Sequence, residues 1–140
     1  MAADAGFGER LEAQTDAYLE PFSDCIRLLP DLLDQYAAGE EYSETVERIQ
    51  TLESDCDRRN REIVALITNA DPKDMGVLNT QINYNQSALV EFYKTVDVVV
   101  NVTERIAQEL EMMQPAHDNK CFEGLREMAE EVAETTATME

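Results

Sequence analysis

The stretch LNTQINYNQSALVEFYKTVDVVVNVTERIAQELEMM, residues 78–113, carries the strongest structural signal in this sequence. Apolar residues recur in it at alternating intervals of four and three, which is the heptad pattern of a helix that packs against other helices. Asp71 and Pro72 are good first residues for such a helix, and Pro115 ends it. We therefore predict a helix over residues 72–114. Its core-facing seam consists of Leu78, Ile82, Asn85, Leu89, Phe92, Val96, Val99, Thr103, Ile106, Leu110 and Met113.

The N-terminal part of the chain has the same helical period over residues 7–38. Pro21 and Pro30 are expected to kink or interrupt this helix, because proline removes a backbone donor and its ring clashes with the preceding turn. Gly39 is expected to end it, since glycine readily adopts the left-handed conformation of a helix terminus. The apolar stripe consists of Phe7, Leu11, Gln14, Tyr18, Phe22, Cys25, Leu29, Leu32 and Tyr36.

Two further helices complete the predicted fold. Ser43 is expected to cap a helix over residues 43–69, whose inward face carries Val46, Ile49, Leu52, Cys56, Ile63 and Leu66. A shorter helix over residues 118–139 is expected to turn Leu125, Met128, Val132 and Met139 inward and Glu123, Glu127, Glu130 and Glu134 outward. Long helices with short connections and no strand-like alternation indicate one all-α domain, an antiparallel bundle of three to four helices.

The charge composition limits the classes of partner. The chain has 30 acidic residues against 11 lysines and arginines, for a net charge of −19. Direct nucleic-acid binding is not expected, because it depends on cations that neutralise phosphates. Only three of the basic residues are lysine, and such an acidic, lysine-poor surface predicts a halophilic, haloarchaeal protein in which salt screens the self-repulsion. With no signal peptide and no long apolar run, we expect a cytoplasmic protein.

The cysteines and the single histidine argue against an enzyme. Cys25, Cys56 and Cys121 show no zinc spacing, and the first two are expected to be buried in the core. His117 follows Pro115 and is expected in a loop, where it completes neither a catalytic triad nor the Glu-x-x-His pattern of di-iron bundles.

The stretch LESDCDRRNREI, residues 52–63, places Glu53 and Asp57 one helical turn apart. In a chain with so many acids that spacing arises often by chance, so on spacing alone the pair is an ordinary solvated face. The neighbouring Arg58, Arg59 and Arg61 either pair with nearby acids such as Asp55 and Glu62 or form a docking patch for an acidic partner or phosphate.

The stretch DVVVNVTERI, residues 97–106, places Asp97, Asn101 and Glu104 on one stripe of the predicted third helix. Three oxygen-bearing side chains in a row suit a site for a hard cation or a polar interface between helices. The run Val98–Val100 widens the apolar arc beside this stripe. We expect it, together with Met112, Met113 and Met128, to be buried in the core, with self-association as the alternative.

These two stretches together resemble the PhoU-like regulators of phosphate uptake. LESDCDRRNREI resembles the acidic motif on the family's second helix, and DVVVNVTERI resembles the D-H-A-V-N-I-A-E stretch on its third helix. The resemblance implies a three-helix unit whose surface carboxylates bind iron, zinc or manganese. It implies that the protein acts on a phosphate transporter or sensor kinase without being an enzyme. The metal ligands carried over by position are Glu53, Asp57 and Asp97, with Asn101 and Glu104 beside them.

The chain departs from the family pattern at several positions. Tyr93 stands where the family usually has an acid, and Val98 stands where it has a histidine. The family carries its three-helix unit twice, whereas residues 118–140 at best begin a second unit, which indicates a shortened form. The alternative function is a structural helical module without metal, which self-associates as a homo-oligomer or completes a bundle with another chain.

Overall fold

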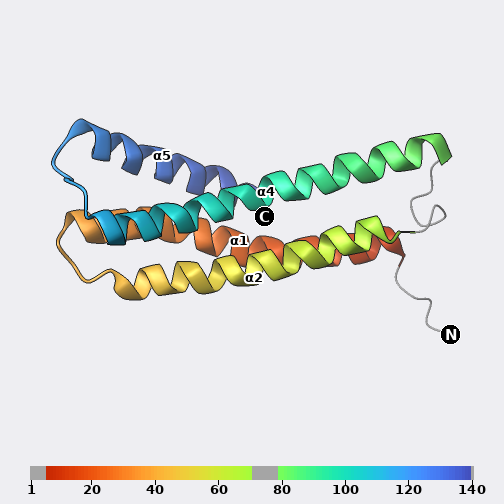
Figure 1. Ribbon diagram of the computed structural model, residues 1–140, viewed down its shortest axis with the longest axis horizontal. Coiled ribbons are helices and arrows are strands. Elements are labelled where there is room, and N and C mark those ends of the chain that lie inside the picture. The colour runs from red at the N-terminus through yellow and green to blue at the C-terminus, as the bar shows by residue number, and fades with distance from the viewer. Residues whose placement is uncertain (1–5, 71–78, 140) are drawn as a thin grey trace.

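The computed structural model describes residues 6–70 and 79–139, and all regular structure in these residues is helical (Figure 1). The third predicted helix is in place, but its expected start at residue 72 and its cap Asp71 lie outside the described residues, as do the side chains of Leu78, Ile82 and Asn85. The predicted all-α bundle is confirmed. The helices are α1 (Phe7–Ala37), α2 (Ser43–Thr68), α4 (Asn79–Met113) and α5 (Lys120–Ala137).

The four helices run alternately up and down the long axis of the molecule (Figure 1). α2 packs against both α1 and α4, while α5 packs against α1. With 18 residues, α5 is about 27 Å long, roughly half the length of α4 with its 35 residues. α5 therefore covers only one end of the bundle. Within the described segments, no helix combines the length and the apolar character that a membrane crossing requires.

α1 continues through both of its prolines, contrary to the expected interruption. Pro21 is buried and Pro30 is half-buried inside one unbroken helix of 31 residues. The tertiary packing of its apolar face outweighs the loss of two backbone hydrogen bonds. The expected end at Gly39 is confirmed, since Gly39 has φ +72° and its N–H donates to the carbonyl of Tyr36 while that of Glu40 donates to Gln35. This pair of bonds is a Schellman motif.

α2 begins at Ser43, the residue expected to cap it, so its cap lies one residue earlier than expected. Ser43 is the first helical residue and Tyr42 occupies the capping position, so the prediction of Ser43 as the cap was wrong. The Ser43 N–H is satisfied instead by the carboxylate of Glu41, at 3.0 Å. At the start of α5, by contrast, the side chain of Asn119 accepts from the N–H of Phe122 at 2.9 Å, as an N-cap should.

The core is built largely from α1 and α2, is completed by residues of α4 and α5, and follows the predicted stripes of the first two helices. Cys25 and Cys56 are fully buried, as expected, and each behaves as a small apolar residue. Burial raises the pKa of both thiols, which keeps them protonated and unreactive. The largest fully buried side chains of the two helices are Tyr18, Phe22, Ile26, Leu32, Leu33, Val46, Ile49, Ile63 and Ile67.

α4 turns a different face inward from the predicted seam. Phe92 and Met113, both assigned to the seam, are 54% and 70% exposed. Six residues of α4 are buried: Tyr93, Asp97, Val100, Thr103, Ala107 and Leu110. Thr103 and Leu110 are seam residues and are buried as predicted, whereas the other four lie one residue further along than the seam. The inward face is therefore turned by only part of the roughly 100° that separates successive residues. Of the run Val98–Val100, expected in the core, only Val100 is buried.

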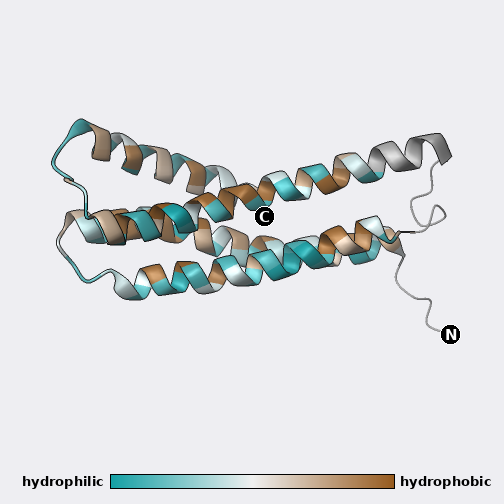
Figure 2. Cartoon of the chain, in the orientation of Figure 1, coloured by the Kyte–Doolittle hydropathy of each residue, from teal (hydrophilic) through white to brown (hydrophobic). Residues whose placement is uncertain are grey.

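α5 shows the same kind of rotation. Met128, Val132 and Met139 were expected to face inward and are exposed, while Leu125 is half-buried. The contacts with α1 are made instead by smaller side chains that allow close approach. Met112 is exposed as well, so apolar side chains of α4 and α5 stand at the surface. Figure 2 shows hydrophobic residues recurring along both helices. The buried residues of α5 are Phe122, Ala129, Ala133 and Thr136.

Candidate functional site

The packing of α2 against α4 brings the two acidic stretches together. Glu53 on α2 lies within hydrogen-bonding reach of Glu104 on α4, and it feels the charges of Asp57 and Asp97. A hydrogen bond between two carboxyl groups requires that one of them carry a proton. The two stretches, separate in the sequence, therefore form one carboxylate cluster, which we define as Glu53, Asp57, Asp97 and Glu104.

Glu53 is the most perturbed carboxyl group of the cluster. Partial burial is the largest cause, followed by the charge and the hydrogen bond of Glu104, and together with the acids around it they raise the pKa of Glu53 to about 7. A glutamate in water titrates near 4.3. Near neutral pH, Glu53 can therefore gain or lose a proton with small changes in its surroundings.

Asp97 is the buried member of the cluster, with only 8% of its surface exposed. Burial raises its pKa and the charge of Asp57 adds to this, while a hydrogen bond from Tyr18 opposes it. The Tyr18 hydroxyl on α1 donates to Oδ1 of Asp97 at 3.1 Å. This bond links the first and third long helices and supplies the buried carboxylate with a donor.

Two more polar contacts fix α4 in this orientation. The buried Asn60 amide on α2 donates to the backbone carbonyl of Tyr93 at 2.9 Å, and the Tyr93 hydroxyl lies 2.7 Å from that of Thr15 on α1. A buried polar group left without a partner costs about 1–3 kcal/mol, so these bonds favour the face with Tyr93 and Asp97 over the apolar face next to it. Sequence reasoning missed Tyr18 and Asn60 as partners of this region. The only available signal for Asn60 was its place among the inward positions of α2.

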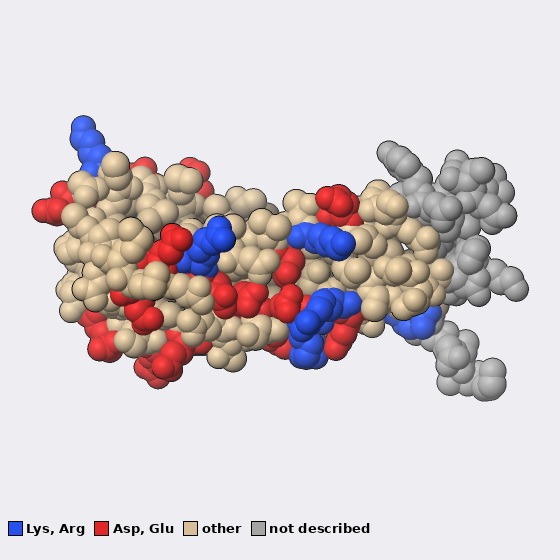
Figure 3. Space-filling view, viewed as in Figure 1, with Lys and Arg blue, Asp and Glu red and all other residues tan. Residues whose placement is uncertain are grey.

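Asp57 lies at the rim of the cluster, beside an open groove of about 590 Å³ between α2 and α4. Its carboxylate pairs with Arg61 at 3.2 Å. The exposed Asn101 borders the groove without a hydrogen bond to the four described carboxylates, and Lys94 stands on the opposite rim. On the face seen in Figure 3, acidic and basic side chains lie side by side over the middle of α2 and α4.

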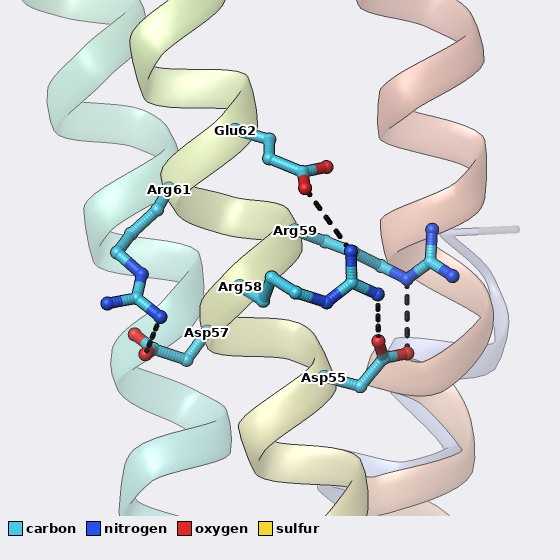
Figure 4. A network of polar contacts seen from close by, with 6 residues as sticks. All are labelled: Asp55, Asp57, Arg58, Arg59, Arg61 and Glu62. Atoms are coloured by element: carbon cyan, nitrogen blue, oxygen red, sulfur yellow. Dashed lines mark hydrogen bonds and ion pairs between the residues drawn. The ribbon is translucent and has the colours of Figure 1, made fainter.

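Arg58, Arg59 and Arg61, three of the four arginines of α2, pair within the chain. Asp55 accepts from Arg58 at 2.5 Å and from Arg59 at 3.1 Å, and Arg58 also reaches Glu62 at 3.2 Å (Figure 4). The prediction of intramolecular pairing is thus confirmed. Burial alone would raise the pKa of Asp55, but the hydrogen bonds and charges of the two arginines outweigh it and lower the pKa.

The carboxylate cluster supplies the oxygen donors that hard cations prefer, but its members point to one another and to protein groups. Within residues 6–70 and 79–139 no set of three or more His, Cys, Asp or Glu side chains is arranged to hold a metal ion. Glu53 lies within hydrogen-bonding reach of Glu104, Asp57 pairs with Arg61 and Asp97 accepts from Tyr18. In this arrangement the side chains do not form a metal-ligand set.

The same chain was compared with known protein families, with curated proteins and with solved structures. None of them matches it.

Proposed function

We propose that this protein is a non-enzymatic, PhoU-like regulator of phosphate transport or phosphate signalling, which works in the cytoplasm through contacts with a transporter or sensor kinase. The observation that carries the proposal is the carboxylate cluster, in which the two stretches that resemble the family's motifs face each other across α2 and α4. A carboxylate cluster whose charge and helix contacts can change suits a protein that acts by binding other proteins. The proposal includes no catalytic step.

The charge pattern around the cluster supports a recognition role. Arg61 and Lys94 stand on opposite rims of the groove, in a chain whose charge is −19. A basic segment of a partner would be attracted by the surrounding acids, while these two cations would set its register. In a salt-rich cytoplasm, which the acidic composition favours, short-range contacts of this kind act while long-range attraction is screened.

The second candidate function is a structural module that pairs with a further helix. It is favoured by the apolar side chains that stand exposed on α4 and α5, among them Phe92, Val102 and Met128. Large exposed apolar patches are typical of surfaces that bind proteins. The two candidates differ in which surface is essential, the carboxylate cluster or the apolar surface of α4.

The discriminating experiment is crosslinking of the purified protein to membranes that contain the host's phosphate transporter and sensor kinases. Three forms are compared: the native protein, the double variant Asp57→Asn/Asp97→Asn and the variant Phe92→Ser. The regulator predicts a crosslink to a phosphate transporter or kinase that the double variant loses and Phe92→Ser retains. Loss in Phe92→Ser alone, or a crosslink only between copies of this chain, would support the structural module.

The metal ions that the resemblance implies are tested separately, because the regulator does not depend on them. The protein is purified without a tag in molar KCl, and iron, zinc and manganese are measured against the same double variant. Asp55→Asn is the matched control, since Asp55 lies on the same helix but pairs with arginines. Stoichiometric metal that only the double variant loses would assign a metal site to the cluster. Equal metal in all three proteins would exclude one.

A further inference from the structure

A cluster of aromatic rings lies at the end of the bundle where the α1–α2 and α4–α5 connections meet. Tyr36 is at its centre, in the last turn of α1, with Tyr42 from the first connection and His117 from the second. Phe122 of α5 is buried beneath them. His117 is in a loop, as its position after Pro115 predicted, but its ring is part of this cluster.

The rings stand at steep angles to one another. Those of Tyr36 and Tyr42 have centroids 5.6 Å apart and an interplanar angle of 72°. Those of Tyr36 and His117 are also 5.6 Å apart, at 85°. Rings at these angles to Tyr36 turn their faces in different directions, whereas a parallel stack would leave one flat surface.

These rings border a hollow of about 450 Å³, separate from the carboxylate cluster. Tyr36 and Tyr42 are half-buried and His117 is exposed, so solvent reaches all three. Glu40 is the charged residue on the rim, and neither Lys nor Arg contributes to the lining. The complete lining is Tyr36, Gly39, Glu40, Tyr42, Gln114, Pro115 and His117.

The backbone around the hollow is held in unusual conformations. Gln114 has φ +46°, the one positive φ among the described residues other than glycine, and Gly39 across the hollow has φ +72°. A non-glycine residue rarely adopts this conformation, and it persists where its surroundings fix it. Here the Tyr36 hydroxyl donates to the carbonyl of Pro115, which fastens the second connection to the end of α1.

We infer that this hollow is a binding site for a quaternary ammonium cation, such as a trimethylammonium group. Aromatic faces attract cations through their negative quadrupole, and methylated ammonium groups are well suited because they carry little hydration to remove. Glu40 adds a negative charge at the rim, and the net charge of −19 disfavours an anion there. The site is independent of the proposed regulatory role.

Choline and 3,3-dimethyl-1-butanol test the inference, because they share one shape and differ in charge. Each is titrated into the full chain at constant ionic strength, and the amide and aromatic signals are followed by NMR. The site predicts that choline shifts the signals of Tyr36, Tyr42 and His117 and binds at least fivefold more tightly than the neutral alcohol. Its methyl protons should move upfield, since they lie over ring faces. Equal binding of the two compounds, or no shifts at these residues, would overturn it.

Variants assign the binding to the rings. Tyr42→Leu removes one ring and should weaken choline binding about two- to fivefold. Tyr42→Phe keeps the ring and should bind choline as the native protein does. Phe92→Leu is the matched control, because it removes an exposed ring elsewhere on the chain. If Tyr42→Leu proves unfolded by its amide spectrum, Glu40→Gln replaces it and should weaken binding without touching the rings. Unchanged binding in a folded Tyr42→Leu or in Glu40→Gln would contradict the assignment.

Discussion

Glu53 and Asp55 stand two residues apart on α2, yet their carboxyl groups respond to the fold in opposite ways. Asp55 lies between Arg58 and Arg59, and its pKa is lowered (Figure 4). Glu53 faces Glu104 of the next helix, and its pKa is raised to about 7. Residues two apart on a helix point in different directions, so each meets a different neighbour.

The difference shows that the pKa of an acidic side chain in this protein depends on the groups it contacts more than on the type of residue. The Asp55 face is a set of exposed ion pairs within one helix, and such pairs contribute little to stability. The Glu53 face joins two helices and, through Asp97 and Tyr18, reaches a third. The proposed function therefore rests on the Glu53 face, where a proton or a partner's charge would alter the contact between helices.

The largest effect on stability is expected when Asp97, at the buried end of the Glu53 face, loses its hydrogen-bond donor. Tyr18→Phe leaves the carboxylate of Asp97 buried without the hydroxyl bond and should lower the free energy of unfolding by about 2 kcal/mol at pH 8. Chemical denaturation in molar KCl measures this, with Tyr42→Phe as the control. A loss below about 0.5 kcal/mol would show that the Tyr18–Asp97 bond does not stabilise the fold.

A smaller effect is expected when the Glu53 face is converted to resemble the Asp55 face. Glu104→Lys places a cation opposite Glu53, so the pKa of Glu53 should fall towards its ordinary value or below it. The free energy of unfolding at pH 8 should rise by about 1 kcal/mol, the upper range for an incompletely buried pair. Glu109→Lys, an exposed position on the same helix, corrects for the change in net charge. Equal stabilisation by both variants would mean that Glu104 does not act on Glu53.

The pH dependence of stability should separate the two faces. Because the folded pKa of Glu53 is raised, its contribution to stability is fully present below pH 4.5 and is lost as the pH rises through 7. Relative to Glu53→Gln, the native protein should lose stability over this interval, by less than about 1 kcal/mol once solvent screening is allowed for. Asp55→Asn should show the opposite sign, since a lowered pKa gives stability that is lost in acid. Melting temperatures from pH 4 to 8 measure both differences.

The smallest effect is expected on the Asp55 face itself. Arg58→Ala removes two exposed ion pairs and should lower the free energy of unfolding only slightly, an effect that molar salt should abolish. Denaturation at low and high KCl measures it. A large loss that persists in molar salt would place Arg58 in the stabilising framework and weaken the contrast between the faces.

The sequence was sufficient to predict the four helices and most of the α1–α2 core, because apolar residues on those helices follow a single narrow stripe. It was insufficient for α4, whose apolar arc is too wide to define one face. The orientation depends on bonds from Asn60 and Tyr18, and hydrogen-bond partners on other helices leave no periodic signal in the chain. The predicted inward face of α5 was wrong for a related reason. The helix packs closely on α1 through Ala129 and Ala133, and its larger side chains face outward.

The same limit applies to the candidate site. Spacing alone placed Asp97, Asn101 and Glu104 on one stripe, but Asp97 is buried, Glu104 is half-buried and Asn101 is exposed. The sequence identifies Glu53 and Glu104 as acids on two different helices. Their interaction follows from the register of α2 against α4. That register is a property of the packed core and cannot be read from either stretch by itself.

The most direct test of the Glu53–Glu104 pair is a carboxyl ¹³C NMR titration of glutamate-labelled protein treated with a chelator, with Glu53→Gln to assign the signal. The shared proton predicts a midpoint for Glu53 near pH 7 in the native protein and a clear decrease in Glu104→Gln. A midpoint near the ordinary glutamate value of about 4.3 in both proteins would contradict the pairing and return Glu53 to the solvated surface.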